Sequence, residues 1–413
     1  MDTQWQAQLH EMYTASSVQQ ALAFIHKDHE RTVQEQVALT EIPAPAFQEQ
    51  KRGAAYAEKL KALGLEGVRT DSVGNVFGIR RGHGKGPTVV VCAHLDTVFP
   101  EGTDVTVKHI DGKLYAPGIS DDGRGLTVVL AVLRALQQTG IQTIGDLVFG
   151  ATVGEEGVGD LRGVKALCAD SEWPIDGFLS IEPGSPRRTT YLATGSHRYK
   201  VTYRGPGGHS FGDFGTPSAI HALGRAVARI ADVVTPNDPK TTFTVGEISG
   251  GTSVNTIAQE ASMLIDLRSN DETALATLET DVLAILRDAC TKENERWQTE
   301  EGISVQIDLI GDRPAGQQSA ESVIVQVAGA AAGELGLEPA LDGAQSTDAN
   351  VPIALGIPAV TLGGGGGCGG MHTLAEYFDP TGAHIGVQRV LLTVLGLVGV
   401  EGVIEPLLGP RLS

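Results

Sequence analysis

The sequence predicts an α/β protein in which a mostly parallel sheet is flanked by helices and interrupted by an inserted α+β domain. Three observations predict this fold class: short apolar runs alternate with helical stretches, these runs lack polar alternation, and residues 190–302 follow a different pattern. The chain has 413 residues, enough for two to three domains of ordinary size. Hydrophobic residues make up 41% and charged residues 20%, which is typical of a folded globular chain.

The first part of the chain is predicted to be helical, and strands are predicted from Thr88 onward. A continuous apolar run without alternation is typical of a parallel strand buried on both faces. Strands that alternate with helices therefore predict a parallel sheet covered on both sides. The predicted helices are 21–37, 48–63 and 126–138, and the predicted strands are 88–93, 147–153, 177–181 and 358–362.

Residues 190–302 are predicted to form a separate domain inserted into the first. Residues 197–203 alternate polar and apolar side chains, as a half-exposed strand does. A helix, two strands and a long helix are expected after it, at 217–233, 242–248, 261–267 and 272–297. This β-α-β-β-α order predicts a ferredoxin-like α+β domain. The expected division is 1–189, 190–302 and 303–413, with the first sheet resuming near Ile303.

Charge and composition exclude several classes of partner. The 31 basic and 50 acidic residues give a net charge of -19, and so acidic a surface repels phosphate backbones, so nucleic acid is not expected. No stretch approaches the roughly 18 apolar residues of a membrane span, and no secretory leader is visible at the start of the sequence. The cysteines are far apart and form no C-x-x-C pair, so reduced thiols and a cytoplasmic location are expected; they are Cys92, Cys168, Cys290 and Cys368.

Ligand-type side chains follow the carboxyl ends of the four predicted strands, where open parallel sheets bind their ligands. Taken singly, each has an ordinary explanation, such as a hydrogen-bonded histidine, a helix cap or a flexible glycine linker. Together they would repel one another without cations. The segments are His94-Leu95-Asp96, Glu155-Glu156, Glu182 and, after the glycine tract Gly363–Gly370, His372, with Asp121-Asp122 before a predicted helix.

This set of histidines and carboxylates without cysteine suits zinc, manganese or cobalt. More than four candidate ligands indicate two metal ions, roughly 3.5–4 Å apart, that share a bridging carboxylate and a bridging water. In the pair Glu155-Glu156, one carboxylate can bind metal while its neighbour takes a proton from water as general base.

The chain resembles the co-catalytic dizinc exopeptidases and amidohydrolases, a family that includes peptidase T, carboxypeptidase G, aminoacylase, acetylornithine deacetylase and succinyl-diaminopimelate desuccinylase. The resemblance covers nearly the whole chain from about residue 35. It rests on His94-Leu95-Asp96-Thr97-Val98, Gly118-Ile119-Ser120-Asp121-Asp122-Gly123, Gly154-Glu155-Glu156-Gly157, Glu182-Pro183, Gly207-Gly208-His209-Ser210, Ser253-Val254-Asn255-Thr256 and Met371-His372-Thr373.

The resemblance implies the roles of the metal ligands and of the general base. Asp121 is implied to bridge two zinc ions, for which Co²⁺ or Mn²⁺ can substitute. His94 and Glu182 would complete one site, and Glu156 and His372 would complete the other. Glu155 is implied to be the general base, and Asp96 is implied to orient the imidazole of His94.

For the inserted domain, the resemblance implies a dimerisation lid and hence a homodimer. His209 would reach the active site of the partner subunit and stabilise the oxyanion there. Asn255 and Arg268 match lid positions that hold the substrate, although a surface salt bridge remains an equal explanation for Arg268. In place of the Lys or Met that many members carry after the bridging acid, this chain has Asp122, Gly123 and Arg124.

The implied function is zinc-dependent hydrolysis of amide bonds, with a metal-bridging water and Glu155 as base. An exopeptidase on short peptides is expected, acting as a di- or tripeptidase, an aminopeptidase or a carboxypeptidase; the alternative is an N-acyl amino acid deacylase. The metal ligands are common to both, but residues 97–103 and 112–118 look most like the carboxypeptidase G and peptidase T branches. A non-catalytic binding protein would have lost ligands or base, and none is missing. The glycine tract is expected either to approach a ligand closely or to be mobile, and Cys368 within it to be a thiol near the ligand or a bystander.

Overall fold

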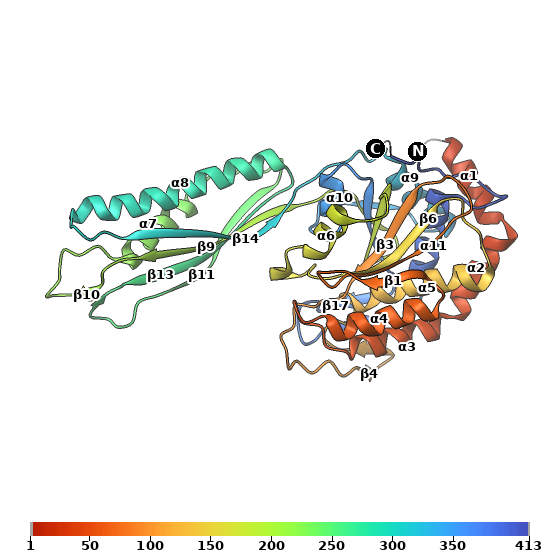
Figure 1. The fold of residues 1–413 in the computed structure, drawn as a ribbon, viewed down its shortest axis with the longest axis horizontal. Helices are drawn as coiled ribbons and strands as arrows, with labels where there is room; N and C mark the ends of the chain where they lie inside the picture. The colour runs from red at the N-terminus through yellow and green to blue at the C-terminus, as the bar shows by residue number, and fades with distance from the viewer. Residues whose placement is uncertain (1–2, 412–413) are drawn as a thin grey trace. The chain divides into compact units, whose positions relative to one another are not determined.

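The computed structural model describes residues 3–411, and the chain divides into two compact units (Figure 1). The first unit combines the residues up to Leu192 with those from Gln317 onward, and the second is the continuous segment Ala193–Gly316. The two ends of the second unit pair with each other, because the N–H of Ala193 donates to the carbonyl of Gly316 at 2.9 Å and the N–H of Gly316 donates back at 3.2 Å.

The first unit is built on an eight-stranded sheet. Its central strands β6, β3, β7 and β16 pair in parallel, whereas β1, β2 and β8 make antiparallel pairs toward the edges. This confirms the predicted mostly parallel sheet. In spatial order the strands are β1 (Glu66–Thr70), β2 (Val76–Arg80), β6 (Asp146–Thr152), β3 (Thr88–His94), β7 (Gly177–Glu182), β16 (Ala359–Gly363), β8 (Arg188–Thr190) and β15 (Ala340–Asp342).

Helices cover this sheet, and its central strands are buried along their length. On one side α5 contacts β3 and β7, and α11 packs against α5. The apolar side chains of Val89, Val91 and Ala93 join these helices in one core, whereas Cys92, which alternates with them, lies near Cys168 of α6. The helices are α1 (Thr3–Thr14), α2 (Ser16–Lys27), α3 (His29–Thr40), α4 (Gln50–Ala62), α5 (Gly123–Thr139), α6 (Arg162–Asp170), α9 (Val323–Glu334), α10 (Asn350–Ala354) and α11 (His384–Val398).

Several elements of this unit differ from the sequence prediction. The predicted helix 21–37 is divided between α2 and α3, and the strands β1 and β2 occupy residues expected to be helical. A second sheet of four short strands was not predicted. Its order is β17 (Gly367–Gly369), β18 (Tyr377–Asp379), β5 (Lys113–Tyr115) and β4 (Lys108–Ile110). Within the described residues, no helix has both the length and the apolar character needed to cross a bilayer.

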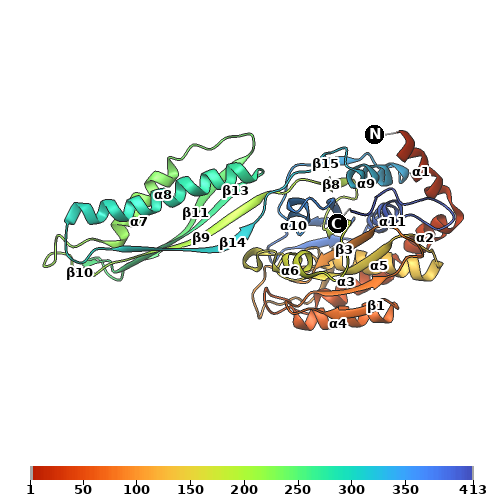
Figure 2. The ribbon, with the colours of Figure 1, turned by 45° about the horizontal axis from the view of Figure 1, so that its top comes forward.

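The second unit is a four-stranded antiparallel sheet with two helices on one face (Figure 2). Apolar side chains of α7 and α8 pack with those of β9 and β13 in a core of its own. The sheet order is β11 (Thr241–Gly250), β13 (Glu260–Ser269), β9 (Gly195–Arg204) and β14 (Ser304–Arg313); the helices are α7 (Ala219–Ala231) and α8 (Glu272–Trp297), and a ribbon joins β10 (Gly208–His209) to β12 (Thr256–Ile257).

The end of the inserted segment lies further along the chain than the expected boundary at 302. Residues Ser304–Arg313, which the sequence analysis assigned to the first sheet, form β14 and pair with β9 along its length. The element order therefore becomes β-α-β-β-α-β, which completes the ferredoxin-like motif. The strand has the half-exposed pattern of this sheet and not the continuous burial of the parallel one.

Candidate metal centre

Two neighbouring parallel strands, β3 and β7, end at the first group of ligand-type side chains. His94 is the last residue of β3, and Glu182 is the last residue of β7. The imidazole Nε2 of His94 lies 3.0 Å from Oδ1 of Asp121 and 3.9 Å from Oε2 of Glu182. Asp121 comes from the loop before α5, so three separate segments meet at this point.

A second group shares Asp121 with the first. The imidazole Nε2 of His372 lies 3.1 Å from Oδ2 of Asp121 and 2.9 Å from Oε1 of Glu156, which follows β6. Each oxygen of the Asp121 carboxylate therefore faces a different imidazole. In each of the two groups, one ligand atom per residue lies within 4.8 Å of the others.

The protonation of the cluster fits a site for cations. Burial alone lowers the pKa of His94, but the hydrogen bond to Asp121 and the nearby carboxylates outweigh it, so that pKa lies well above its usual value. The hydrogen bond to Asp121 is the main reason that the pKa of His372 rises to about 9. Burial raises the pKa of Glu156 to about 7 and that of Glu182 well above its usual value. The buried carboxylates of the cluster repel one another, and bound cations would compensate their negative charge.

Asp96 supports the site through both its carboxylate and its backbone. Its carboxylate accepts the N–H of Glu155 at 3.0 Å and that of Glu156 at 2.9 Å. Nδ1 of His94 lies 3.0 Å from the carbonyl oxygen of Asp96, but 3.7 Å from its carboxylate. The group of Asp96 that contacts the imidazole of His94 is thus its backbone carbonyl. The side chain of Asp96 holds the backbone of Glu155 and Glu156 instead.

Glu155 lies beside the cluster, and only 6% of its surface is exposed. Its carboxylate forms a third close group with His94 and Glu156. Asp122, which follows Asp121 in the sequence, does not join the cluster but caps α5, because its Oδ1 accepts the N–H of Gly125 at 2.7 Å.

The sequence analysis missed Glu376, which connects two of the ligand loops. This fully buried carboxylate accepts backbone N–H groups from Gly118 at 2.8 Å, Ser120 at 2.8 Å and Asp121 at 2.9 Å. Glu376 lies four residues after His372, so one side chain couples the turn of His372 to the loop of Asp121. Its only signal in the sequence is this proximity to a candidate ligand.

Two buried arginines donate hydrogen bonds to backbone carbonyl oxygens of the loops at this site. Arg52 donates to the carbonyl of Leu95, between His94 and Asp96, at 2.8 Å. Arg124 donates to the carbonyl of Gly364 at 2.9 Å. Arg124 thus anchors the glycine tract.

The glycine tract approaches protein backbone and not an open ligand space. The N–H of Gly364 donates to the carbonyl of Glu182 at 2.8 Å, and a Cβ on Gly363 would overlap the carbonyl oxygen of Ser185. Burial raises the pKa of the Cys368 thiol. Among the described residues, Cys368 belongs to none of the close groups of ligand-type side chains.

The remaining predicted site residues lie in the second unit. His209 pairs with Thr256 in the β10–β12 ribbon, and the N–H of Ser210 donates to the carbonyl of Asn255 at 3.0 Å. The structure therefore brings His209 and Asn255 together. Arg268 lies near the other end of β13 from Glu260, the first residue of that strand; eight residues correspond to roughly 26 Å at the rise of a strand. The Nε of Arg268 lies 2.6 Å from Oδ2 of Asp266. This salt bridge is the alternative that the sequence left open for Arg268.

The peptidase family M20/M25/M40 matches residues 90–395 of the chain. The chain belongs to this family. As an M20/M25/M40 member it is a hydrolase, and the resemblance found in its motifs is confirmed.

Other M20/M25/M40-like proteins show what this member is similar to. A succinyl-diaminopimelate desuccinylase from Nitrosococcus oceani is 28% identical over 250 residues, 56% of this chain and 66% of the relative. Carboxypeptidase G2 from a Pseudomonas species is 28% identical over 347 residues, 78% of this chain and 77% of the relative. The structure of a tripeptidase from Staphylococcus aureus matches with a TM-score of 0.73 at 24% identity, over 89% of this chain and 97% of the other, which shows the shared fold.

Proposed function

We propose that this protein is an exopeptidase that cleaves short peptides with two divalent metal ions, zinc in the first instance. The observation that carries the two-metal part of the proposal is the Asp121 carboxylate, with one oxygen facing His94 and the other facing His372. A carboxylate shared in this way suits two adjacent ions better than one.

In the proposed site, His94 and Glu182 would hold one ion, Glu156 and His372 would hold the other, and Asp121 would serve both. When bound, such ions polarise the scissile carbonyl and lower the pKa of a bound water to about 7. Glu155 takes the proton of the attacking water and returns it to the departing amine. Asp96 keeps Glu155 in place through its hydrogen bond to the Glu155 N–H.

A second candidate is the hydrolysis of N-acyl amino acids. It is favoured by the similarity to the desuccinylase, of which this chain spans about two thirds. The metal ligands serve either substrate class, because both reactions break an amide bond.

A matched substrate panel on the zinc-loaded protein tests both candidates, with free di- and tripeptides, N-acetyl and N-succinyl amino acids, and acyl glutamates. Cleavage of unblocked peptides alone supports an exopeptidase that binds the free amine, and cleavage of the blocked compounds supports the deacylase or a carboxypeptidase. Glu155→Gln is the control for contaminating hydrolases. If no compound is cleaved by metal-loaded protein, both candidates are wrong.

We also propose that the enzyme is a homodimer that pairs through its second unit, with His209 completing the active site of the partner. Exposed apolar side chains near His209 support this proposal: Phe211 is 88% exposed and Phe214 is 78% exposed. Light scattering together with activity tests it, because a fully active monomer would contradict this role of His209.

The free cysteines of the chain support a cytoplasmic site of action.

A further inference from the structure

A hollow of about 420 Å³ in the first unit is lined in part by Glu156, one of the proposed metal ligands. Three loops form its wall: the one after α3, the one after β3 and the one after β6. Its volume lies within the range of roughly 300–1,000 Å³ that is usual for ligand pockets. The hollow is therefore continuous with the proposed site of hydrolysis.

Apolar side chains dominate this wall, and some of them are unusually exposed. Val158 is 69% exposed and Val98 is 39% exposed, while Phe99 forms a buried part of the lining. Pro45 and Pro100 add further apolar surface. Covering such side chains with an apolar group of a ligand is favourable in proportion to the area removed from water.

The charges on the wall are all of one sign. Glu156 and the exposed Glu101 are its charged side chains, and no Lys, Arg or His is among the described residues that line the hollow. Arg162 stacks on Phe47 beside it, but its guanidinium is paired with Glu49 at 2.6 Å. Because a bound metal ion would compensate Glu156, the exposed carboxylate of Glu101 is the like charge that an acidic side chain would meet here.

The loops that form the hollow are tied to the framework. The N–H of Thr97 donates to the carbonyl of Ala44 at 2.9 Å, which joins the first two loops. The carboxylate of Asp96 accepts the N–H of Glu156 at 2.9 Å, which joins the second to the third. The hollow is thus preformed, and little ordering is required on binding.

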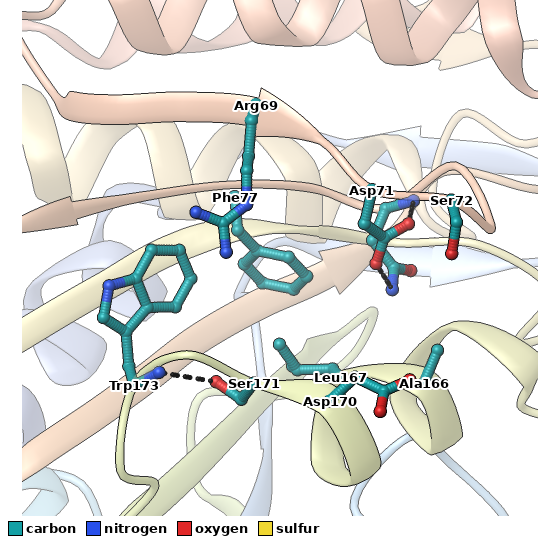
Figure 3. A pocket seen from close by; sticks show the side chains of 10 residues that line it. Arg69, Asp71, Ser72, Phe77, Ala166, Leu167, Asp170, Ser171 and Trp173 are labelled. Atoms are coloured by element: carbon teal, nitrogen blue, oxygen red, sulfur yellow. Dashed lines mark hydrogen bonds between the residues drawn. The ribbon is translucent and has the colours of Figure 1, made fainter.

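We infer that this hollow receives one side chain or acyl chain next to the scissile amide and selects neutral apolar groups over acidic ones. The inference rests on the proposed function, whose substrate class it narrows. A different hollow, between β1 and α6, is unsuitable because it measures only about 70 Å³ and Arg69 lies over the ring of Trp173 within it (Figure 3).

The test compares kcat/KM of the metal-loaded full chain on substrates that differ in one side chain, alanyl, leucyl or glutamyl, placed in turn on either side of the amide. We expect the leucyl substrate to exceed the alanyl one by about tenfold or more at one position, with the glutamyl substrate lowest. Val158→Asp should remove this preference for leucine, and Glu101→Lys should raise the glutamyl rate relative to the leucyl rate. Leu355→Asp is the matched control, because Leu355 is 55% exposed in the same unit and does not line the hollow.

Calorimetric titration with N-acetyl-leucinamide and N-acetyl-glutamate tests the pocket without turnover. Binding of the leucine compound that is lost in Val158→Asp but kept in Leu355→Asp supports the pocket, even if no substrate is cleaved and the proposed function is wrong. Failure to bind the leucine compound overturns the pocket. So does hydrolysis whose side-chain preference is unchanged in Val158→Asp and Glu101→Lys.

Discussion

Replacement of Glu376 by glutamine should weaken both the fold around the metal centre and the binding of metal. One oxygen of this buried carboxylate accepts the N–H groups of Ser120 and Asp121, and the other accepts that of Gly118. A glutamine retains one acceptor oxygen and places an NH₂ group against the third N–H.

The expected cost combines two effects. Loss of one hydrogen bond to a charged group costs about 1.5–3 kcal/mol, and a buried N–H left without an acceptor costs about 1–3 kcal/mol. We therefore expect the Glu376→Gln change to lower the free energy of unfolding by roughly 3–5 kcal/mol. Because the loop also carries Asp121, metal affinity should fall by roughly 10- to 100-fold, as for other residues that orient ligands.

Urea unfolding and competition with a chromogenic chelator measure these two quantities. Glu58→Gln is the control, because Glu58 is an exposed carboxylate on α4 that pairs with Lys61. A Glu376→Gln protein with unchanged metal affinity and an unchanged unfolding midpoint would refute the idea that Glu376 holds the ligand loop.

Three further predictions concern the base, the glycine tract and the pH dependence. Glu155→Gln should abolish turnover while the metal content stays unchanged, as measured by atomic emission. Gly363→Ala should destabilise the protein by roughly 1–3 kcal/mol in urea, the usual cost of overpacking, because its Cβ would overlap the carbonyl of Ser185. Burial is the largest cause of the lowered pKa values of His29 and His384. As the pH falls below 6.5, the unfolded chain therefore binds more protons than the folded chain, so the free energy of unfolding decreases as the pH decreases. Replacing both histidines with Gln should flatten this dependence down to about pH 5.

Each of these predictions has a contradicting result. Loss of metal from Glu155→Gln would make this residue a ligand and not the base. The control is Gly343→Ala, because a Cβ at Gly343 would meet no atom within 4 Å. An unchanged unfolding midpoint in Gly363→Ala would show that the backbone of the tract can shift at little cost in free energy. An equal slope of stability against pH in the double histidine variant would remove burial of these imidazoles as its source.

The close grouping of these histidines and carboxylates was predictable because strand ends mark ligand positions in a parallel sheet. His94 and Glu182 end buried strands whose apolar runs are visible in the sequence. Glu376 could not be found in this way, because it acts on backbone N–H groups of a loop more than 250 residues away.

The missed strands have a different cause. Those of the second small sheet, such as β17 and β18, are three residues long, too short for any alternation to be visible. The end of the inserted unit was misplaced although Pro314 and Gly316 follow β14, because the side-chain pattern of β14 does not show which sheet the strand joins. Its membership is decided by its pairing with β9, which is a tertiary fact.

The bridge between Ala193 and Gly316 has an evolutionary consequence. Since the second unit starts and finishes at one paired position, a deletion of the whole segment would leave two chain ends that a short turn can rejoin. The strands that lead to ligand-type side chains, β3, β6 and β7, all precede this junction, and His372 follows it. The segment could therefore be deleted or exchanged at the gene level as one piece, with the path of the chain through the first sheet unaltered.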